Sequence, residues 1–129
     1  MKPRDSALRA KRFEAAEKAR KVSSLEAMIR DFETMVAELT RQISVEEERT
    51  GIKDAAHFAY STFAKAAAQR RDNLRQSTEG LRDKLAVAVR ERDDTVEAFS
   101  RATQQADGHA ERPHGAARRD RPFGFTALR

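Results

Sequence analysis

The sequence predicts an all-α fold in which two long helices form an antiparallel coiled-coil hairpin, followed by a mobile C-terminal tail. Apolar residues recur at alternating spacings of three and four, and one glycine-containing break near residue 51 separates two helical stretches. Charged residues make up 36% and aromatic residues 6% of the 129 residues, which is typical of long helices. The expected hairpin spans 1–106, with helices over about 4–50 and 61–105, a turn over about 51–60 and a flexible basic tail over 107–129.

The clearest pattern lies in the first predicted helix. Its apolar positions follow the 3.5-residue average of a coiled-coil seam. These positions are Val22, Leu25, Ile29, Phe32, Val36, Leu39 and Ile43. Met28 and Met35 widen the stripe to one side, which indicates contact with more than one narrow partner. Because a helix with one apolar stripe cannot bury it alone, the segment needs a partner helix.

The start of the first helix is weakly apolar. Counting back from Val22, one column of the seam holds Lys11 and Lys18. We expect Leu8, Phe13 and Val22 to supply most of the apolar contacts there.

Residues around position 51 predict the turn. Gly51 is expected to end the first helix in the left-handed conformation, and Ser61 or Thr62 is expected to cap the second helix. Phe58 and Tyr60 are expected to pack back over the turn.

Three consecutive glutamates, Glu46, Glu47 and Glu48, lie in the last turns of the first helix. The helix dipole disfavours negative charge there. Two interpretations stay open at this point: a solvated acidic end, or a docking point for a basic surface.

The second helix has a poorer seam, and Gly80 inside it costs roughly 1 kcal/mol relative to alanine. Its predicted seam is Tyr60, Ala64, Ala67, Arg71, Leu74, Thr78, Leu81, Leu85, Ala88, Arg92, Thr95 and Phe99. A shifted series through Val89 and Val96 also fits. Folding the chain at about residue 55 pairs positions whose numbers sum to about 110, and this places large residues opposite small ones near the turn.

Charge is unevenly spread along the chain, whose net charge is +5. Residues 1–21 carry +5, residues 22–50 carry −4, and residues 51–106 and 107–129 carry +2 each. Such asymmetry favours contacts with protein partners over general affinity for nucleic acid.

Motifs for catalysis, metal binding or cofactors are not evident, so we expect no enzyme and no cofactor. The chain contains no cysteine, and no phosphate-binding glycine loop. His57 is expected to be structural or solvated, and His109 and His114 have a spacing that fits no common zinc pattern. No apolar signal core follows the basic N-terminus, so we expect a cytoplasmic protein.

Several segments resemble the FliJ family of flagellar export proteins, in its alphaproteobacterial form. The first runs from Arg4 to Phe13 and continues through Glu17-Lys18-Ala19-Arg20. The second, which is the most specific, runs from Glu46 through Ile52 and Ala55 to Ala67. The third is Gln69-Arg70-Arg71-Asp72-Asn73-Leu74, so that the resemblance covers about residues 4–100.

This resemblance implies a non-enzymatic hairpin of the flagellar type III export apparatus. Members of the family are similar in shape to the stalk of rotary ATPases. They contact the export ATPase ring and the cytoplasmic domain of the membrane export gate, and they escort export chaperones. The protein is then expected at the cytoplasmic face of the inner membrane, held through its partners. In this family the second helix runs further, whereas Gly108 and Pro113 predict its end here, so the ATPase contact is expected mainly within 4–21.

Two groups of site residues follow from these considerations. Free basic side chains on a poorly packed helix end suit an acidic partner surface. The expected ATPase-binding residues are Arg4, Arg9, Lys11, Arg12, Lys18, Arg20 and Lys21. The expected gate-binding residues are Arg70, Arg71, Leu74 and Arg75, within the densest basic run of the helices. For Arg71 the alternative is a side chain laid along the seam with its guanidinium in water.

Two other functions fit the same fold. One is a nucleic-acid- or ribosome-associated basic hairpin, which the net positive charge favours, although no aromatic residues are interleaved with the basic run. The other is the equivalent stalk of a virulence-type secretion system, which would share the fold and differ in its partners.

Overall fold

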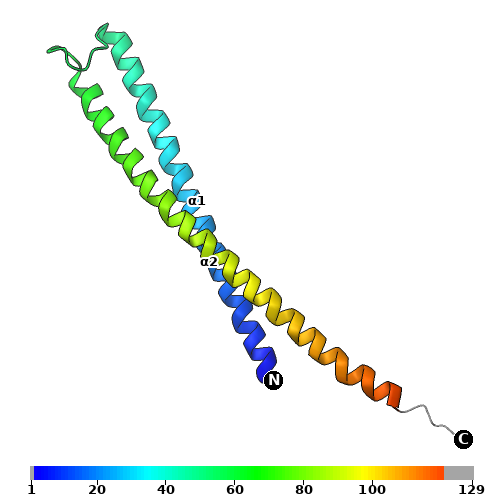
Figure 1. Ribbon diagram of the computed structural model, residues 1–129. Coiled ribbons are helices and arrows are strands. Elements are labelled where there is room, and N and C mark those ends of the chain that lie inside the picture. Colours follow the sequence, from blue (N-terminus) through cyan, green and yellow to red (C-terminus); the bar gives the residue numbers. More distant parts are fainter. Residues whose placement is uncertain (1, 121–129) are drawn as a thin grey trace, which may run out of the picture. The chain divides into compact units, whose positions relative to one another are not determined.

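The computed structural model describes residues 2–120, and their side chains over 2–108. These residues form helices α1 (Pro3–Thr50) and α2 (Thr62–Asp120), and the described chain contains no strand. After the turn, α2 returns beside α1 in the opposite direction (Figure 1). The predicted fold class, two long helices in an antiparallel hairpin, is confirmed.

The chain divides into two units, each of which contains part of both helices. Residues 20–90 form the turn unit. Residues up to 19 and residues from 91 onward form the terminal unit.

Two apolar clusters hold the turn unit together. One contains Val22, Leu25, Ile29, Leu81 and Ala88, with Phe32, Leu85 and Val89 packed against it. The other contains Leu39, Ile43, Ala64 and Ala67, with Tyr60, Ala68 and Leu74 packed against it. Both clusters join residues whose numbers sum to about 110, so the predicted pairing of the helices is confirmed.

The predicted seam of α2 is also confirmed, because each of its positions is buried or half-buried. Thr78 is only 4% exposed, and its hydroxyl donates to the carbonyl oxygen of Leu74 at 2.8 Å. This bond satisfies the polar group inside an otherwise apolar row. In the shifted series, Val89 packs against the core, whereas Val96 is exposed.

The terminal unit has few apolar contacts among its described residues. Ala15 is buried, and Leu8 and Phe99 are half-buried. The expectation that Phe13 holds this end is wrong, because its side chain is 65% exposed. Phe13 precedes Ala15 by two residues, which turns it about 200° around the helix, away from α2.

The predicted end of the second helix, at about residue 105, is also wrong. The backbone of α2 stays helical through Gly108 and Pro113 to Asp120. A glycine inside a helix costs about 1 kcal/mol relative to alanine, and a proline, which removes one backbone donor and clashes with the preceding turn, costs about 3 kcal/mol. The flexibility predicted for 107–129 stays a prediction, and residues 121–129 lie outside those described.

The turn between the helices follows the predicted signals. Gly51 has a φ of 75°, and its N–H donates to the carbonyl oxygen of Glu47 at 2.9 Å. This left-handed glycine ends α1. Ser61 caps α2, because its hydroxyl oxygen accepts the N–H of Ala64 at 3.1 Å.

Candidate functional site

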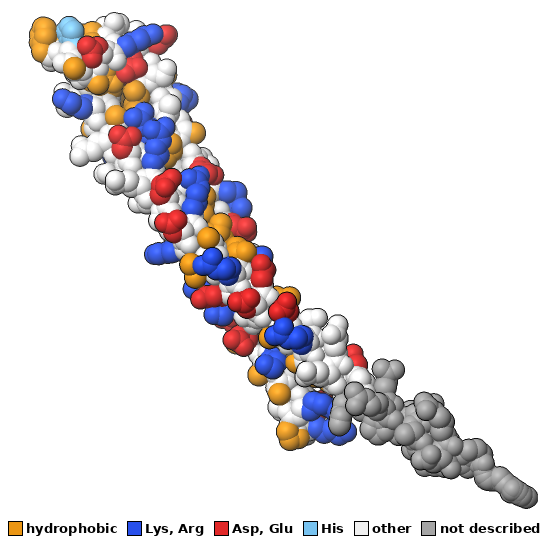
Figure 2. All heavy atoms as spheres, viewed as in Figure 1, with side chains coloured by type: hydrophobic (Ala, Val, Ile, Leu, Met, Phe, Trp, Pro, Cys, Tyr) orange, Lys and Arg blue, Asp and Glu red, His pale blue; other side chains and the backbone are white. Residues whose placement is uncertain are grey.

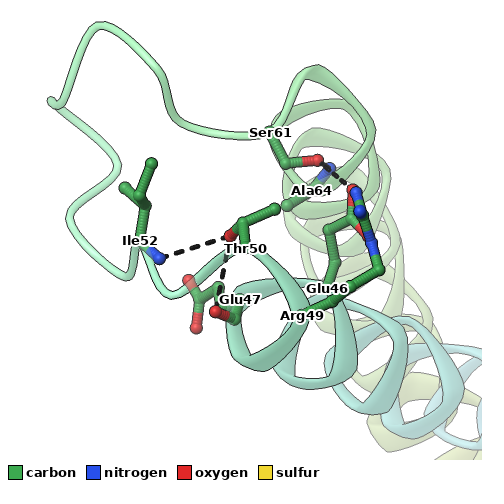
Figure 3. A network of polar contacts seen from close by, with 7 residues as sticks. All are labelled: Glu46, Glu47, Arg49, Thr50, Ile52, Ser61 and Ala64. Atoms are coloured by element: carbon green, nitrogen blue, oxygen red, sulfur yellow. Dashed lines mark hydrogen bonds and ion pairs between the residues drawn. The ribbon is translucent and has the colours of Figure 1, made fainter.

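A polar network centred on Glu46, near the end of α1, reaches Ser61, just before α2 (Figure 3). The Ser61 hydroxyl donates to Glu46, and the Arg49 guanidinium donates to both carboxylate oxygens of Glu46 at 2.8 and 3.0 Å. Glu47 lies beside this network and accepts the hydroxyl of Tyr60 at 2.7 Å. Two neighbouring carboxylates of α1 are therefore bound to residues at the start of α2.

These bonds shift the pKa values of Glu46 and Tyr60. Hydrogen bonds from Arg49 and Ser61 lower the pKa of Glu46 to about 2, because they stabilise its charged form. The bond to Glu47, together with burial, raises the pKa of Tyr60. The side chain of Glu46 is only 15% exposed, so the solvated acidic end that the sequence allowed does not describe it. Glu48, in contrast, is exposed.

Sequence reasoning missed that Glu46 and Glu47 connect the two helices. The available signal was the pairing rule, because both glutamates stand near Tyr60 and Ser61 when the chain is folded at about residue 55. The three adjacent acidic residues were instead interpreted only through their shared negative charge, as a solvated end or a docking point. The expectation that Tyr60 packs over the turn is confirmed, since it packs against the second apolar cluster.

At the apex of the turn, the expectation for Phe58 is wrong. Its side chain is 96% exposed, and its ring stacks on His57 with centroids 4.8 Å apart. Local bonds fix this arrangement: the carbonyl of Asp54 accepts the N–H of His57 at 3.0 Å, and the Nδ1 atom of His57 accepts the N–H of Ala59 at 3.0 Å. These tight turns satisfy the backbone locally and direct the Phe58 ring outward.

The basic end of α1 separates into two groups. Arg4, Arg9, Lys11 and Arg12 are exposed, and within the described residues no ion pair involves them. Lys18, which was expected to be free, lies 3.7 Å from the carboxylate of Glu91. Arg20 and Lys21 also take part in interactions. The structure therefore leaves four of the seven expected residues available to a partner.

A shallow groove lies beside these four cations in the terminal unit. Its volume is about 320 Å³, and its lining combines apolar Leu8 and Phe99 with Arg9 and Arg12. Asp5 and Thr103 complete the lining. An acidic surface with an apolar residue would match this combination of a guanidinium rim and an apolar floor.

The four residues expected to contact the export gate do not form one face. Leu74 packs against the apolar core, and Arg71 lies half-buried along the seam, 3.2 Å from Asp72. Arg70 and Arg75 are exposed. The alternative interpretation of Arg71, a stem along the seam with its charged end at the surface, describes its position. Only the two exposed arginines are placed to meet a partner.

Charged side chains of both signs alternate over the face seen in Figure 2, and hydrophobic side chains show between them. Over the described residues, no helix is both long enough and apolar enough to cross a membrane. Within the same residues, no group of three or more acidic, histidine or cysteine side chains could hold a metal ion. His109 and His114 lie outside the residues whose side chains are described.

Comparisons with protein-family models, with curated proteins and with solved structures find no match to this chain. The site is therefore interpreted from its own residues.

Proposed function

We propose that this chain is a non-enzymatic stalk and escort component of the bacterial flagellar type III export apparatus. In this role it links the export ATPase ring to the cytoplasmic domain of the membrane export gate, with export chaperones as further partners. It acts in the cytoplasm and is held at the inner membrane through these partners.

The turn is the observation that carries the proposal. The segment that most specifically resembles the FliJ family, from Glu46 to Ala67, is also the segment that joins the two helices. Glu46 and Glu47 bind Ser61 and Tyr60, and Ala64 and Ala67 are buried beneath them. The resemblance therefore falls on residues with a definite task in the hairpin, which supports a shared architecture.

Two further features support a stalk. The exposed cations at the start of α1 are available to an acidic ring interior, which they would approach by long-range attraction. The helix α2 extends to Asp120, which agrees with the longer second helix of the resembling family.

Deletion of the gene tests the proposal. We expect the deletion strain to lose flagella and swimming, and a plasmid carrying the unaltered chain to restore both. A plasmid carrying Ile29→Asp, which removes the packing of the hairpin, should not restore them. Unchanged flagellar assembly and swimming after deletion would refute the proposed function, and a loss of protein secretion without a loss of swimming would point to a virulence-type stalk.

The exposed cations of α1 also favour a second candidate, a nucleic-acid- or ribosome-associated hairpin. Binding through phosphate contacts weakens steeply as salt concentration rises, because bound counterions are released. Titration of labelled RNA and duplex DNA at several salt concentrations separates the two functions. Tight binding with a steep salt dependence would support the second candidate, and weak binding at physiological salt would exclude it.

A further inference from the structure

The two flanks of the turn unit differ in character. On one flank, Arg82 of α2 donates to Glu33 of α1 at 2.6 Å and bridges the helices. On the other flank, Lys21, Lys84 and Val87 line a groove of about 320 Å³ whose floor includes Leu25. Asp83 completes the lining of this groove.

Large apolar side chains continue along this second flank. Met28 and Met35 follow Lys21 by one and two heptads, so they lie on the same side of α1. Their exposed fractions are 41% and 47%, and that of Val87 is 45%. We call Met28 and Met35 of α1, with Lys84 and Val87 of α2, the methionine flank.

Single exposed apolar residues are ordinary, but an aligned row beside an apolar groove is typical of a contact surface. Methionine suits such a surface because its flexible side chain adapts to a neighbour. Among the residues whose side chains the structure describes, none buries the methionine flank.

The charges of the two helices indicate what covers it. Residues 22–50 carry seven acidic and three basic side chains, whereas residues 61–90 carry seven basic and three acidic ones. The first stretch therefore has a net charge of −4 and the second of +4. A surface that places an acidic helix beside a basic one is complementary to a copy of itself turned by a half rotation.

One pair of opposite charges, Asp31 of α1 and Lys84 of α2, lies at the flank itself. Asp31 lies three residues after Met28 and four before Met35, and therefore on the same face of α1. Asp31 and Lys84 are both exposed, and no ion pair among the described residues involves either of them. Each is available to an opposite charge on another molecule.

We propose that a second copy of this chain covers the methionine flank, forming a dimer in which α1 of each copy lies on α2 of the other. A two-fold axis parallel to the helices produces this arrangement and brings Asp31 near Lys84 of the other copy. An axis perpendicular to the helices would stack α1 on α1, and like charges would then meet. The proposal concerns self-association and goes beyond the export function proposed above.

Sedimentation equilibrium of the full chain tests the dimer. We expect a dimer at micromolar concentrations, and we expect Met28→Lys with Met35→Lys to weaken it at least about tenfold, because two charges would be buried at the contact. Thr34→Lys with Ala37→Lys adds the same charge to the outer face of α1 and serves as the control. Circular dichroism checks that both variants stay helical. A monomeric wild type at about 100 μM, or equal weakening by both pairs, would overturn the proposal.

Charge exchange tests the complementarity. Asp31→Lys and Lys84→Asp should each weaken the dimer, and their combination should restore much of the affinity because the opposite charges then face each other again. Low salt should enlarge all three effects. If the combined variant dimerises as weakly as the sum of the two single effects predicts, Asp31 and Lys84 do not face each other in the dimer.

The direction of the two copies is tested at the turn. The chain has no cysteine, so Lys53→Cys introduces a single thiol at an exposed turn position. A parallel two-fold axis puts both turns at the same end, and a short bifunctional maleimide should then join the two copies. A stable dimer of the Lys53→Cys variant in which the reagent fails to join the two introduced thiols would rule out the proposed arrangement.

Discussion

At the scale of single residues, Glu46 and Glu47 at the end of α1 bind residues on the other side of the turn, although their position in the helix is unfavourable for negative charge. The helix dipole disfavours negative charge there. Glu46 and Glu47 offset this cost by accepting hydrogen bonds from Arg49, Ser61 and Tyr60. These residues flank the turn in which the hairpin reverses direction, so the network fixes where the second helix begins.

The lowered pKa of Glu46 makes the turn sensitive to acid. Its pKa is about 2 in the folded chain, against an ordinary value of 4.5. A lowered pKa stabilises the fold above the ordinary value, and this stabilisation is lost as pH falls toward the folded value. We therefore expect Glu46→Gln to lower the melting temperature at pH 7 and to have a shrinking effect between pH 4.5 and pH 2. Thermal melts followed by circular dichroism measure this.

The control for that measurement is Glu48→Gln, which makes the same chemical change at an exposed position two residues away. It should alter the melting temperature little at either pH. A Glu46→Gln effect that does not change between neutral and acidic solution would argue against the charged network.

Tyr60 and Phe58 provide a second comparison at the turn. Tyr60→Phe removes the hydroxyl that donates to Glu47 and should cost about 1 kcal/mol of stability. Phe58→Ser removes a side chain that is 96% exposed and should change the free energy of unfolding by less than about 0.5 kcal/mol. Urea denaturation measures both changes. A larger cost for Phe58→Ser than for Tyr60→Phe would reverse our assignment of which ring supports the turn.

At the scale of the helices, the packing rests on a row of apolar side chains along each helix. One of the two apolar clusters joins Val22, Leu25 and Ile29 of α1 to Leu81 and Ala88 of α2. Because one residue corresponds to a rotation of about 100° around a helix, one residue of displacement would turn these side chains away from the partner helix. The seam therefore sets both the pairing and the direction of the helices.

Ile29→Asp tests this cluster. Ile29 is 8% exposed, and the substitution would place an unpaired charge against Leu81, so we expect a loss of several kcal/mol. The melting temperature by circular dichroism should fall strongly. Thr34→Asp, on the exposed side of the same helix, is the control and should fall little. An unshifted melt for Ile29→Asp would show that this cluster does not hold the hairpin.

Gly80 offers a change in the opposite direction. It lies inside α2, and a Cβ atom added there would meet nothing within 4 Å. Gly80→Ala should therefore raise stability by about 1 kcal/mol, chiefly through helix propensity. Gly51→Ala is the contrasting variant, because its φ of 75° strains any residue with a Cβ and stability should fall. Two variants that shift the urea midpoint in the same direction would contradict this account.

The fold was predictable because helical periodicity is a strong local signal. Every position of the α2 seam, including Arg71 and Thr78, lies where the spacing placed it. The sites were less predictable, because pairing of a charge depends on its neighbour across the hairpin. Lys18 of α1 contacts Glu91 of α2. Glu47 of α1 contacts Tyr60 of the turn. Phe58 was misplaced because tight local turns, and not apolarity, set its direction.

At the scale of the whole chain, charge and packing are distributed unequally. The turn unit contains both apolar clusters, whereas the described part of the terminal unit has a small apolar contact and four exposed cations of α1. A region that contributes little to the core but carries available charge is suited to bind a partner. This division is the basis for the proposal that the ATPase contact lies at Arg4, Arg9, Lys11 and Arg12.

Binding to the purified flagellar export ATPase tests this central claim most directly. The test variant carries Arg9→Glu, Lys11→Glu and Arg12→Glu. The control variant reverses three exposed cations of the turn unit, with Arg30→Glu, Lys65→Glu and Arg90→Glu. Glutamate has nearly the same helix propensity as lysine and arginine, so the test variant should keep its helicity.

We expect the unaltered chain and the control to bind the ATPase. We expect the test variant to bind at least about tenfold more weakly at low salt, with a smaller difference at high salt, because screening reduces the attraction that it has lost. Surface plasmon resonance at two salt concentrations gives the dissociation constants. Equal binding by the test variant, or no binding by the unaltered chain, would contradict the proposed role of this helix end.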